Sequence, residues 1–275
     1  MALTWWEAVV LAIIQGVTEW LPISSSGHLI LANELLGLDG SVGYLLLLHA
    51  GTLAAVVWVY RARLGAMLRS LATLPRDART AGWKVAWASH DDRRLAWWVF
   101  LGTGPIVIAG FVFRSFIAAS HEGLGTLWFD FLLTAVLLAR ASLVPNADRP
   151  VRQMRSLDAL VIGCYQALAL LPAVSRSGAT LAGAVERRFA WAGAADYAFL
   201  LSIPALAGAM VLEWRSFGEL GDAGWLASVL GFTVSAAVGY ASIRFLLAFL
   251  RRSRPWPFAV YCAAVGLALA AVRFL

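Results

Sequence analysis

The chain has 275 residues, of which 61% are hydrophobic and 14% are charged, and its mean hydropathy is +0.75. A soluble domain of average composition carries about 25% charged residues, so an ordinary water-soluble globule and a disordered chain are both excluded. The net charge of +6 does not indicate nucleic acid, because the basic residues lie in short connectors between apolar runs. We therefore expect an all-α polytopic membrane protein that forms a single integral membrane domain over residues 1–275.

Eight apolar runs approach the roughly 20 residues that a helix needs to cross the bilayer core. They lie at about 3–22, 42–60, 95–114, 126–144, 157–172, 195–213, 225–250 and 256–275. Two shorter segments, about 24–37 and 175–189, each begin at a polar, serine-rich break. The runs do not alternate with a period of two, which disfavours a β-barrel. We expect no cleavable signal peptide, because Glu7 interrupts the first run, and no disulfide between Cys164 and Cys262.

The connectors predict the orientation, because cytoplasmic loops are enriched in Lys and Arg. The basic connectors are 61–94, about 145–156 and 251–254, and the connectors poor in basic residues are 115–125 and 216–224. A cytoplasmic position for every basic connector requires that the regions 3–37 and 157–189 do not cross the membrane. Each region is then a re-entrant helical hairpin, the first entering from the outer face and the second from the inner face. Six transmembrane helices remain, with both termini outside.

The two hairpins resemble each other, which predicts an inverted-topology repeat. Gln15 stands nine residues before one serine-rich turn, and Gln166 stands nine before the other. We expect repeat 1 at about 3–114 and repeat 2 at about 157–250, with the remaining helices interleaved. Broken helices of inverted repeats converge on a ligand site near mid-membrane, and non-helical backbone at that depth must lie inside protein or beside water. Both turns should therefore line one buried aqueous cavity.

Polar residues of the first hairpin are functional candidates, because ionisable groups inside apolar runs are costly. Glu19 lies four residues after Gln15 on one helical face, where a carboxylate and an amide can hold a hard divalent cation. Pro22 should end the first helix, and the serines after it can cap the next helix, whose free N–H groups form an anion site. His28 is a candidate acid, base, nucleophile or metal ligand. The alternative for each of these residues is a structural hydrogen bond.

The second hairpin contains the stretch Pro172–Thr180, PAVSRSGAT. A guanidinium at membrane depth that opens a helix between hydroxyl groups suits phosphate oxygens. The alternative is that Arg176 forms a buried structural ion pair with Glu19. Supporting or structural roles are expected for the other polar residues in or near apolar runs, namely Glu34, His49, Asp130, Glu186 and Asp196. His90 and His121 fall in connectors, where we expect them to be solvated.

Two motifs, Gln15–His28 (QGVTEWLPISSSGH) and Pro172–Thr180, resemble those of the undecaprenyl-diphosphate phosphatase family of the bacitracin-resistance type. The resemblance runs from about residue 5 to the C-terminus. It implies a multi-pass hydrolase of the bacterial inner membrane that converts undecaprenyl diphosphate to the monophosphate and so recycles the lipid carrier for cell-wall synthesis. It also implies dependence on Mg²⁺ or Ca²⁺, a site open to the periplasmic or outer face, and a possible homodimer. The expected partners are this lipid substrate and membrane lipid, with no nucleic acid.

The resemblance also implies roles for individual residues. Catalysis falls on Glu19, Ser25, His28 and Arg176, phosphate binding on Ser24, Ser26, Ser175, Ser177 and Thr180, and cation binding on Glu19 and Gln15. Ser25, His28 and water all remain open as the nucleophile. The sequence departs from the family pattern at Gln15, which leaves Glu19 as the only carboxylate of a paired-acid motif, and at Ala173, which replaces a glycine.

Another class of function remains open, a transporter or flippase of polyprenyl phosphates, because inverted repeats with broken helices are typical of transporters. The acid-phosphatase-like lipid phosphatases share a Ser-Gly-His element, but they need a second histidine and an aspartate where this chain has Ala182 and Glu186. We exclude that class. A purely structural membrane protein would leave Glu19, His28 and Arg176 without a role.

Overall fold

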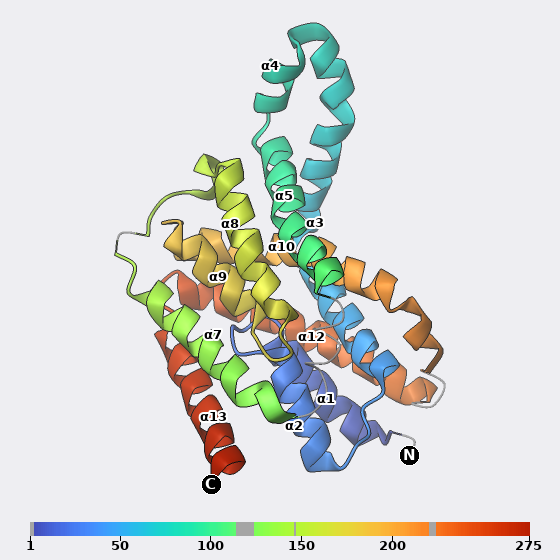
Figure 1. The fold of residues 1–275 in the computed structure, drawn as a ribbon. Helices are drawn as coiled ribbons and strands as arrows, with labels where there is room; N and C mark the ends of the chain where they lie inside the picture. The colour runs from blue at the N-terminus through green and yellow to red at the C-terminus, as the bar shows by residue number, and fades with distance from the viewer. Residues whose placement is uncertain (1–2, 114–123, 146, 220–223) are drawn as a thin grey trace.

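The computed structural model describes residues 3–113, 124–145, 147–219 and 224–275, and these residues are predominantly helical (Figure 1). The α-helices are α1 Trp5–Thr18, α2 Ser25–Leu36, α3 Val42–Ala81, α4 Trp83–Ala88, α5 Asp91–Val112, α7 Leu127–Ser142, α8 Ser156–Ala167, α9 Arg176–Glu186, α10 Trp191–Leu212, α12 Trp225–Leu250 and α13 Trp256–Phe274. Four short 3-10 helices join them: η1 Leu124–Thr126, η2 Val151–Gln153, η3 Leu168–Leu170 and η4 Trp214–Glu219. Within the described ranges no strand forms, and the all-α prediction is confirmed.

Five helices are long and apolar enough to cross a membrane, namely α3, α5, α10, α12 and α13. They correspond to five of the six predicted spans. The sixth, 126–144, forms α7, which has only 16 residues. Large apolar side chains such as Phe111, Phe245 and Val272 are exposed on these helices, as a lipid-facing surface requires. The chain is a multi-pass membrane protein.

Each predicted hairpin forms two short helices on either side of a polar turn. The first pair is α1 and α2, with Pro22 in the turn, where its ring and missing N–H prevent the helix from continuing. The second pair is α8 and α9, and the two helices of each pair pack against each other. The longest of the four has 14 residues, short of the roughly 20 that cross a bilayer core.

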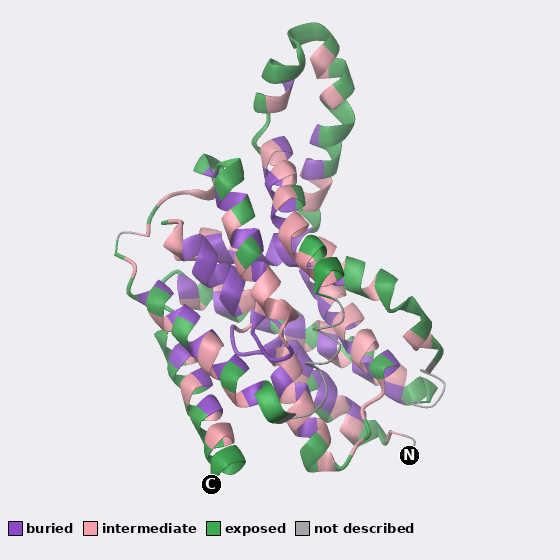
Figure 2. Ribbon diagram, in the orientation of Figure 1, coloured by how far each residue is buried: buried purple, intermediate pink, exposed green. Residues whose placement is uncertain are grey.

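The two halves of the chain interlock around a buried centre. Helix α1 packs against α12, and α8 packs against α5 (Figure 1). Close approach of these helices depends on small residues, as is usual between membrane helices: a Cβ on Gly163 of α8 would lie 2.4 Å from the carbonyl oxygen of Gly102 on α5. Buried residues are concentrated around α9 (Figure 2), where every residue from Gly178 to Val185 is buried. A helix buried on all sides places its N-terminus deep in the protein.

A helical hairpin projects from this body. Helix α3 has 40 residues, about twice the length needed for a bilayer core, and its second half projects together with α4 and the start of α5 (Figure 1). The basic segment 61–94, predicted as a connector, is therefore largely helical. The fully buried Arg93 holds it together, because its guanidinium donates to the carbonyl oxygens of Ser70 and Ala86 and to the carboxylate of Asp77.

This arrangement predicts that Arg93→Ala loosens the projecting hairpin. The substitution leaves the buried carbonyl oxygens of Ser70 and Ala86 without their donor and Asp77 without its cationic partner, which should destabilise the hairpin locally. We expect chymotrypsin to cleave between residues 61 and 94 several-fold faster in the variant than in the wild type. The exposed Arg76 supplies the control, because Arg76→Ala should leave cleavage unchanged. Equal resistance of both variants to cleavage would show that Arg93 does not hold the hairpin.

Candidate active site

The two polar turns meet inside the protein, as the sequence predicts. The Arg176 guanidinium, at the start of α9, forms a close ion pair with Oε1 of Glu19, just after α1. The hydroxyl of Ser177 donates to the carbonyl oxygen of Leu21 at 3.1 Å. The structural alternative for Arg176, a buried pair with Glu19, is thus present. The pair brings the carboxylate of Glu19, from the first turn, and the guanidinium of Arg176, from the second turn, into one site.

Both turns end in the same kind of helix cap. The Ser24 Oγ accepts a hydrogen bond from the Gly27 N–H at 3.2 Å, and the Ser175 Oγ accepts one from the Gly178 N–H at 3.1 Å. Ser24 has a φ of 74°, in a region that residues other than glycine rarely adopt. Strained backbone of this kind persists where surrounding contacts hold it. The first turn is therefore shaped tightly around its capping serine.

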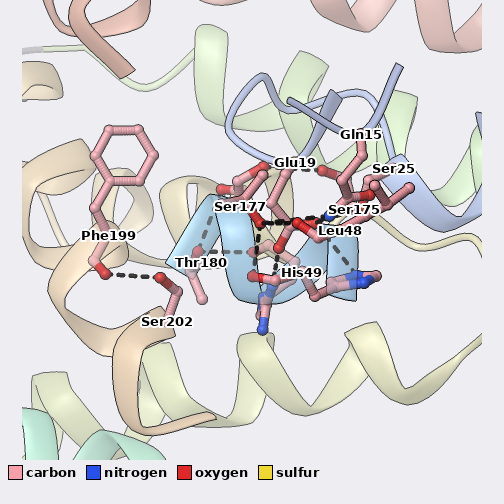
Figure 3. A network of polar contacts seen from close by, with 12 residues as sticks. Gln15, Glu19, Ser25, Leu48, His49, Ser175, Ser177, Thr180, Phe199 and Ser202 are labelled. Atoms are coloured by element: carbon pink, nitrogen blue, oxygen red, sulfur yellow. Dashed lines mark hydrogen bonds and ion pairs between the residues drawn. The ribbon is translucent and has the colours of Figure 1, made fainter. Parts of the chain in front are cut away.

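Glu19 is the centre of a polar network (Figure 3). Its side chain is 2% exposed. While Oε1 binds Arg176, Oε2 accepts from the Ser25 hydroxyl at 2.6 Å and from the Gln15 Nε2 at 3.2 Å. The Nε2 of His49 lies 3.7 Å from the same Oε2. One buried carboxylate therefore orients a guanidinium, a hydroxyl and an amide from different parts of the chain.

A pocket of about 330 Å³ opens at this network. Its polar side is formed by Thr18, Glu19, Ser25, Ser26, His49, Ser175 and Arg176. Its apolar side comes from α3, η3, the second turn, α5 and α10, through Leu46, Ala169, Val174, Ile106, Ala205, Leu206, Ala209 and Met210. A cavity that offers a guanidinium and hydroxyl groups at one side and apolar side chains at the other suits an amphipathic anion, such as a phosphorylated lipid.

His28 faces away from this pocket. Its Nδ1 donates to the carbonyl oxygen of Ser24 at 2.6 Å, and its Nε2 shares a hydrogen bond of 2.7 Å with the hydroxyl of Tyr261. The ring stacks on Tyr261 and meets Phe131 edge-on. Both ring nitrogens are thus engaged outside the pocket, and the acid–base role of His28 stays a prediction.

His49 takes the place beside Glu19 instead. The sequence predicted only a supporting or structural role for it, as for the other polar residues in or near apolar runs. Its spacing carried a signal, because His49 and Thr52, three residues apart, share a helical face. In the structure, the Thr52 hydroxyl lies 3.5 Å from the Gln15 Nε2. That face of α3 is directed at the predicted site.

The remaining candidates divide between the pocket and structural roles. Ser26 lines the pocket, whereas the Thr180 hydroxyl donates to the carbonyl oxygen of Arg176 at 2.7 Å, within its own helix. Three of the other acidic residues have structural partners: Asp130 accepts from the Ala173 N–H, Glu186 from the Tyr165 hydroxyl and Asp196 from the Tyr60 hydroxyl. Glu34 and His90 are exposed. His121 and most of the acidic connectors, 115–123 and 220–223, lie outside the described residues.

The residues around Glu19 can contribute to a cation site. The Oε1 of Gln15 is fully buried and has no hydrogen-bond partner. Among the described residues, His, Cys, Asp and Glu form no cluster of three that could hold a metal ion unaided. Mg²⁺ commonly binds one or two carboxylates together with substrate phosphates. An orphaned amide oxygen beside a single carboxylate fits a cation that also binds a phosphorylated ligand.

Comparison with known proteins gives a consistent set of relatives. The model of a family described as bacitracin resistance protein BacA matches residues 8–268. The chain is similar to an undecaprenyl-diphosphatase of Methanobrevibacter smithii, with 32% identity over 262 residues and 95% of each chain covered. It is also similar to an undecaprenyl-diphosphatase of Desulfatibacillum aliphaticivorans (36% over 279 residues, 98% of this chain and 99% of the relative). A third relative, undecaprenyl-diphosphatase 2 of Stutzerimonas stutzeri, is 38% identical over 270 residues, with 96% of each chain covered.

The shared network predicts that Glu19 and Arg176 are energetically coupled. Glu19→Gln or Arg176→Gln alone leaves the other charge buried without its partner, which should destabilise the protein by about 3 kcal/mol. The double variant removes both charges, so its loss should be clearly smaller than the sum of the two single losses. Thermal unfolding in detergent measures all four proteins. The same cycle between Glu19→Gln and Arg76→Gln, on the projecting hairpin, should be additive, and additivity in the first cycle would contradict the coupling.

Proposed function

The chain belongs to the bacitracin resistance protein BacA family, and from this membership and the chemistry of the pocket we propose that it is an undecaprenyl-diphosphatase. It is a membrane enzyme that hydrolyses undecaprenyl diphosphate to undecaprenyl phosphate and inorganic phosphate. The reaction recycles the lipid carrier for cell-wall synthesis and confers resistance to bacitracin. The observation that carries the proposal is the position of Arg176, Glu19 and Ser25 together at the polar side of a pocket whose other side is apolar.

The two sides of the pocket match the two parts of this substrate. The diphosphate lies against the turns, where Arg176 supplies positive charge. Arg has five N–H donors, and its bond to Glu19 uses one nitrogen, so further donors can bind phosphate oxygens in pairs. Ser26, Ser175 and the N-terminus of α9 add donors. The first prenyl units lie along Ile106 and Met210, and the remaining tail extends into lipid.

Glu19 and Ser25 prepare the attack on the terminal phosphorus. The short bond from the Ser25 hydroxyl to Glu19 Oε2 fixes the serine oxygen at the pocket and polarises its O–H bond. The attacking oxygen belongs to Ser25 itself or to a water molecule held there. His28 bonds to the carbonyl oxygen of Ser24, so we assign it to holding the turn that carries Ser25, in addition to its predicted role with the proton.

We also propose that the site binds a divalent cation, Mg²⁺ or Ca²⁺ on the family resemblance. Side-chain oxygens of Glu19 and Gln15 would hold it. When bound, such an ion neutralises charge that develops on phosphate oxygens. Arg176, from the other turn, stabilises the same negative charge on the phosphate oxygens through hydrogen bonds that are in place before the reaction begins.

The proposed topology has six transmembrane helices, counting α7, and two re-entrant hairpins, α1–α2 and α8–α9, in an inverted repeat. The packing supports it, because the first helix of each repeat lies against the last helix of the other, α1 on α12 and α8 on α5. The possible homodimer stays a prediction.

The orientation follows from the basic projecting hairpin, 61–94. A cytoplasmic hairpin places the start of α3 and the ends of α5 and α10 at the opposite side of the membrane. The pocket lies toward these ends, since Leu46, Ile106 and Met210 line it. We therefore propose a protein of the bacterial inner membrane whose site opens to the periplasmic or outer face.

The central test is phosphate release from undecaprenyl diphosphate by the purified protein in detergent. We expect the wild type to release phosphate and a chelator to suppress the release. Arg176→Ala should lower kcat about 10²- to 10³-fold, as loss of a preorganised donor does, and Arg176→Lys should recover only part of it, because Lys cannot donate in the same fork. Arg76→Ala is the control that keeps full activity. Near-normal turnover in Arg176→Ala would overturn the phosphate-binding role, and lipid movement in liposomes without hydrolysis would favour the transporter.

Ser25→Ala separates the two sources of the attacking oxygen. If Ser25 attacks, the variant should lose at least about 10²-fold in kcat, and acid quenching of the wild type with substrate labelled in the terminal phosphate should trap a phosphoserine. Ser26→Ala, at the neighbouring pocket position, should retain much more activity and the trapped label. A Ser25→Ala enzyme with a tenth or more of the wild-type rate would assign the attack to water.

A further inference from the structure

His49 has the geometry of a metal ligand. Its Nδ1 lies 2.8 Å from the carbonyl oxygen of Leu45. A carbonyl oxygen only accepts hydrogen bonds, so Nδ1 carries the hydrogen and the neutral ring has its lone pair on Nε2. Metal-binding histidines are usually oriented in this way, through a hydrogen bond from the other ring nitrogen to a carbonyl or carboxylate oxygen. The free lone pair of His49 is therefore directed to the Glu19 side of the pocket.

The distances around Glu19 fit donors that share one ion. The His49 Nε2 lies 3.7 Å from Glu19 Oε2, which is too long for a hydrogen bond. Two ligands bound to one ion at about 2.0 to 2.2 Å each stand about 3 to 4 Å apart. The Gln15 amide lies 3.2 Å from the same Oε2. The gap between His49 and Glu19 thus matches the spacing of ligands around a common centre, and the Gln15 amide, whose Nε2 donates to Oε2, stands at a similar distance.

Gln15 supplies the second, independent observation. Its Oε1 is a buried acceptor without a partner, on a side chain that is 0% exposed. Rotation of the amide by 180° exchanges its oxygen and nitrogen at nearly the same positions. As drawn, the Nε2 faces Glu19 and Thr52; the rotated amide presents its oxygen there instead, where an ion would bind it, and its nitrogen takes the position at which Oε1 has no partner.

We propose that His49 completes a cation site with Glu19 and Gln15, and that this site prefers a divalent transition-metal ion to Mg²⁺ or Ca²⁺. The inference deepens the proposed function, because it assumes that Glu19 and Gln15 hold the cation of that enzyme. Mg²⁺ and Ca²⁺ select oxygen donors, whereas imidazole nitrogen suits Fe²⁺, Ni²⁺, Cu²⁺ and Zn²⁺. A donor set of one carboxylate, one amide and one imidazole belongs to the second group.

The neighbouring charges are compatible with this ion. Among the residues that line the pocket, the other charged groups are Glu19 and Arg176. Arg176 binds Oε1 of Glu19, while the proposed ion lies beside Oε2. Charged residues elsewhere on the elements that pack against α3 do not line the pocket; the described ones include Glu7, Asp91, Asp92, Arg93, Arg94, Asp196, Arg215 and Arg244.

Mn²⁺, the weakest binder of the first-row divalent series, is the paramagnetic probe that tests the inference in the substrate-free protein. The full chain is purified in detergent, freed of any histidine tag and stripped with chelator. Electron paramagnetic resonance then counts bound Mn²⁺, and its pulsed form detects a nitrogen ligand. We expect one Mn²⁺ with ¹⁴N coupling, and at least tenfold weaker binding of Mg²⁺ in competition. His49→Gln should abolish the coupling and weaken Mn²⁺ binding about 10- to 100-fold, whereas the control His90→Gln, at an exposed histidine on the projecting hairpin, should change neither.

A second variant guards against misfolding. In His49→Asn the side-chain N–H can still donate to the Leu45 carbonyl oxygen, but no donor replaces Nε2, so this variant should fold and still lose the nitrogen coupling. Absence of ¹⁴N coupling in the wild type, its persistence in both His49 variants, or equal affinity for Mg²⁺ would overturn the inference. Phosphate release by the wild type is measured separately. If the protein hydrolyses the substrate but binds no ion through nitrogen, only the inference about His49 is wrong. If it binds such an ion but does not hydrolyse the substrate, only the proposed function is wrong.

Discussion

The ion pair between Glu19 and Arg176 joins two turns that lie 157 positions apart in the chain. An unpaired charge at this depth is strongly destabilising, so neither hairpin can bury its ionised side chain unless the other is in register. The backbone of the turns imposes the same requirement, because its polar groups need partners within the protein. The N–H groups of Ala173 and Ser175 bond to Asp130 and to Thr134 on α7. The charges and the backbone therefore specify one arrangement of both hairpins.

The same constraint prepares the site for an anion. Arg176 is held by Glu19, and Ser25 is held by the other oxygen of that carboxylate, so these groups keep their positions without a ligand. Preorganised donors need little reorganisation when charge develops on a phosphate. The long apolar helices separate the turns from lipid, and the small residues of α9 allow its N-terminus to lie at the bottom of the pocket. Stability and chemistry here depend on one set of contacts.

Sequence patterns predicted the features that local physics controls. Pro22 ends a helix, and continuous apolar runs form long helices. The high cost of an isolated buried charge predicts that Glu19 and Arg176 form an ion pair. The direction in which a histidine ring points, by contrast, depends on residues that are distant in the sequence. His28 stands within the serine motif, yet it faces Tyr261, 233 positions away, whereas His49 enters the pocket from an apolar run. The basic segment 61–94 was predicted as a connector from its charge, whereas in the structure it forms a helical hairpin in which Arg93 is buried among carbonyl groups.

The amide of Gln15, in place of a second carboxylate, also affects the balance of charge around Glu19. One carboxylate and one guanidinium leave the pair neutral, and a second carboxylate at position 15 would make it anionic. A neutral pair repels an incoming diphosphate less than an anionic pair does, since like charges interact strongly at low dielectric. It also attracts a cation less strongly. In the cation site that we propose, the Nε2 of His49, 3.7 Å from Glu19 Oε2, would add the donor that a single carboxylate lacks.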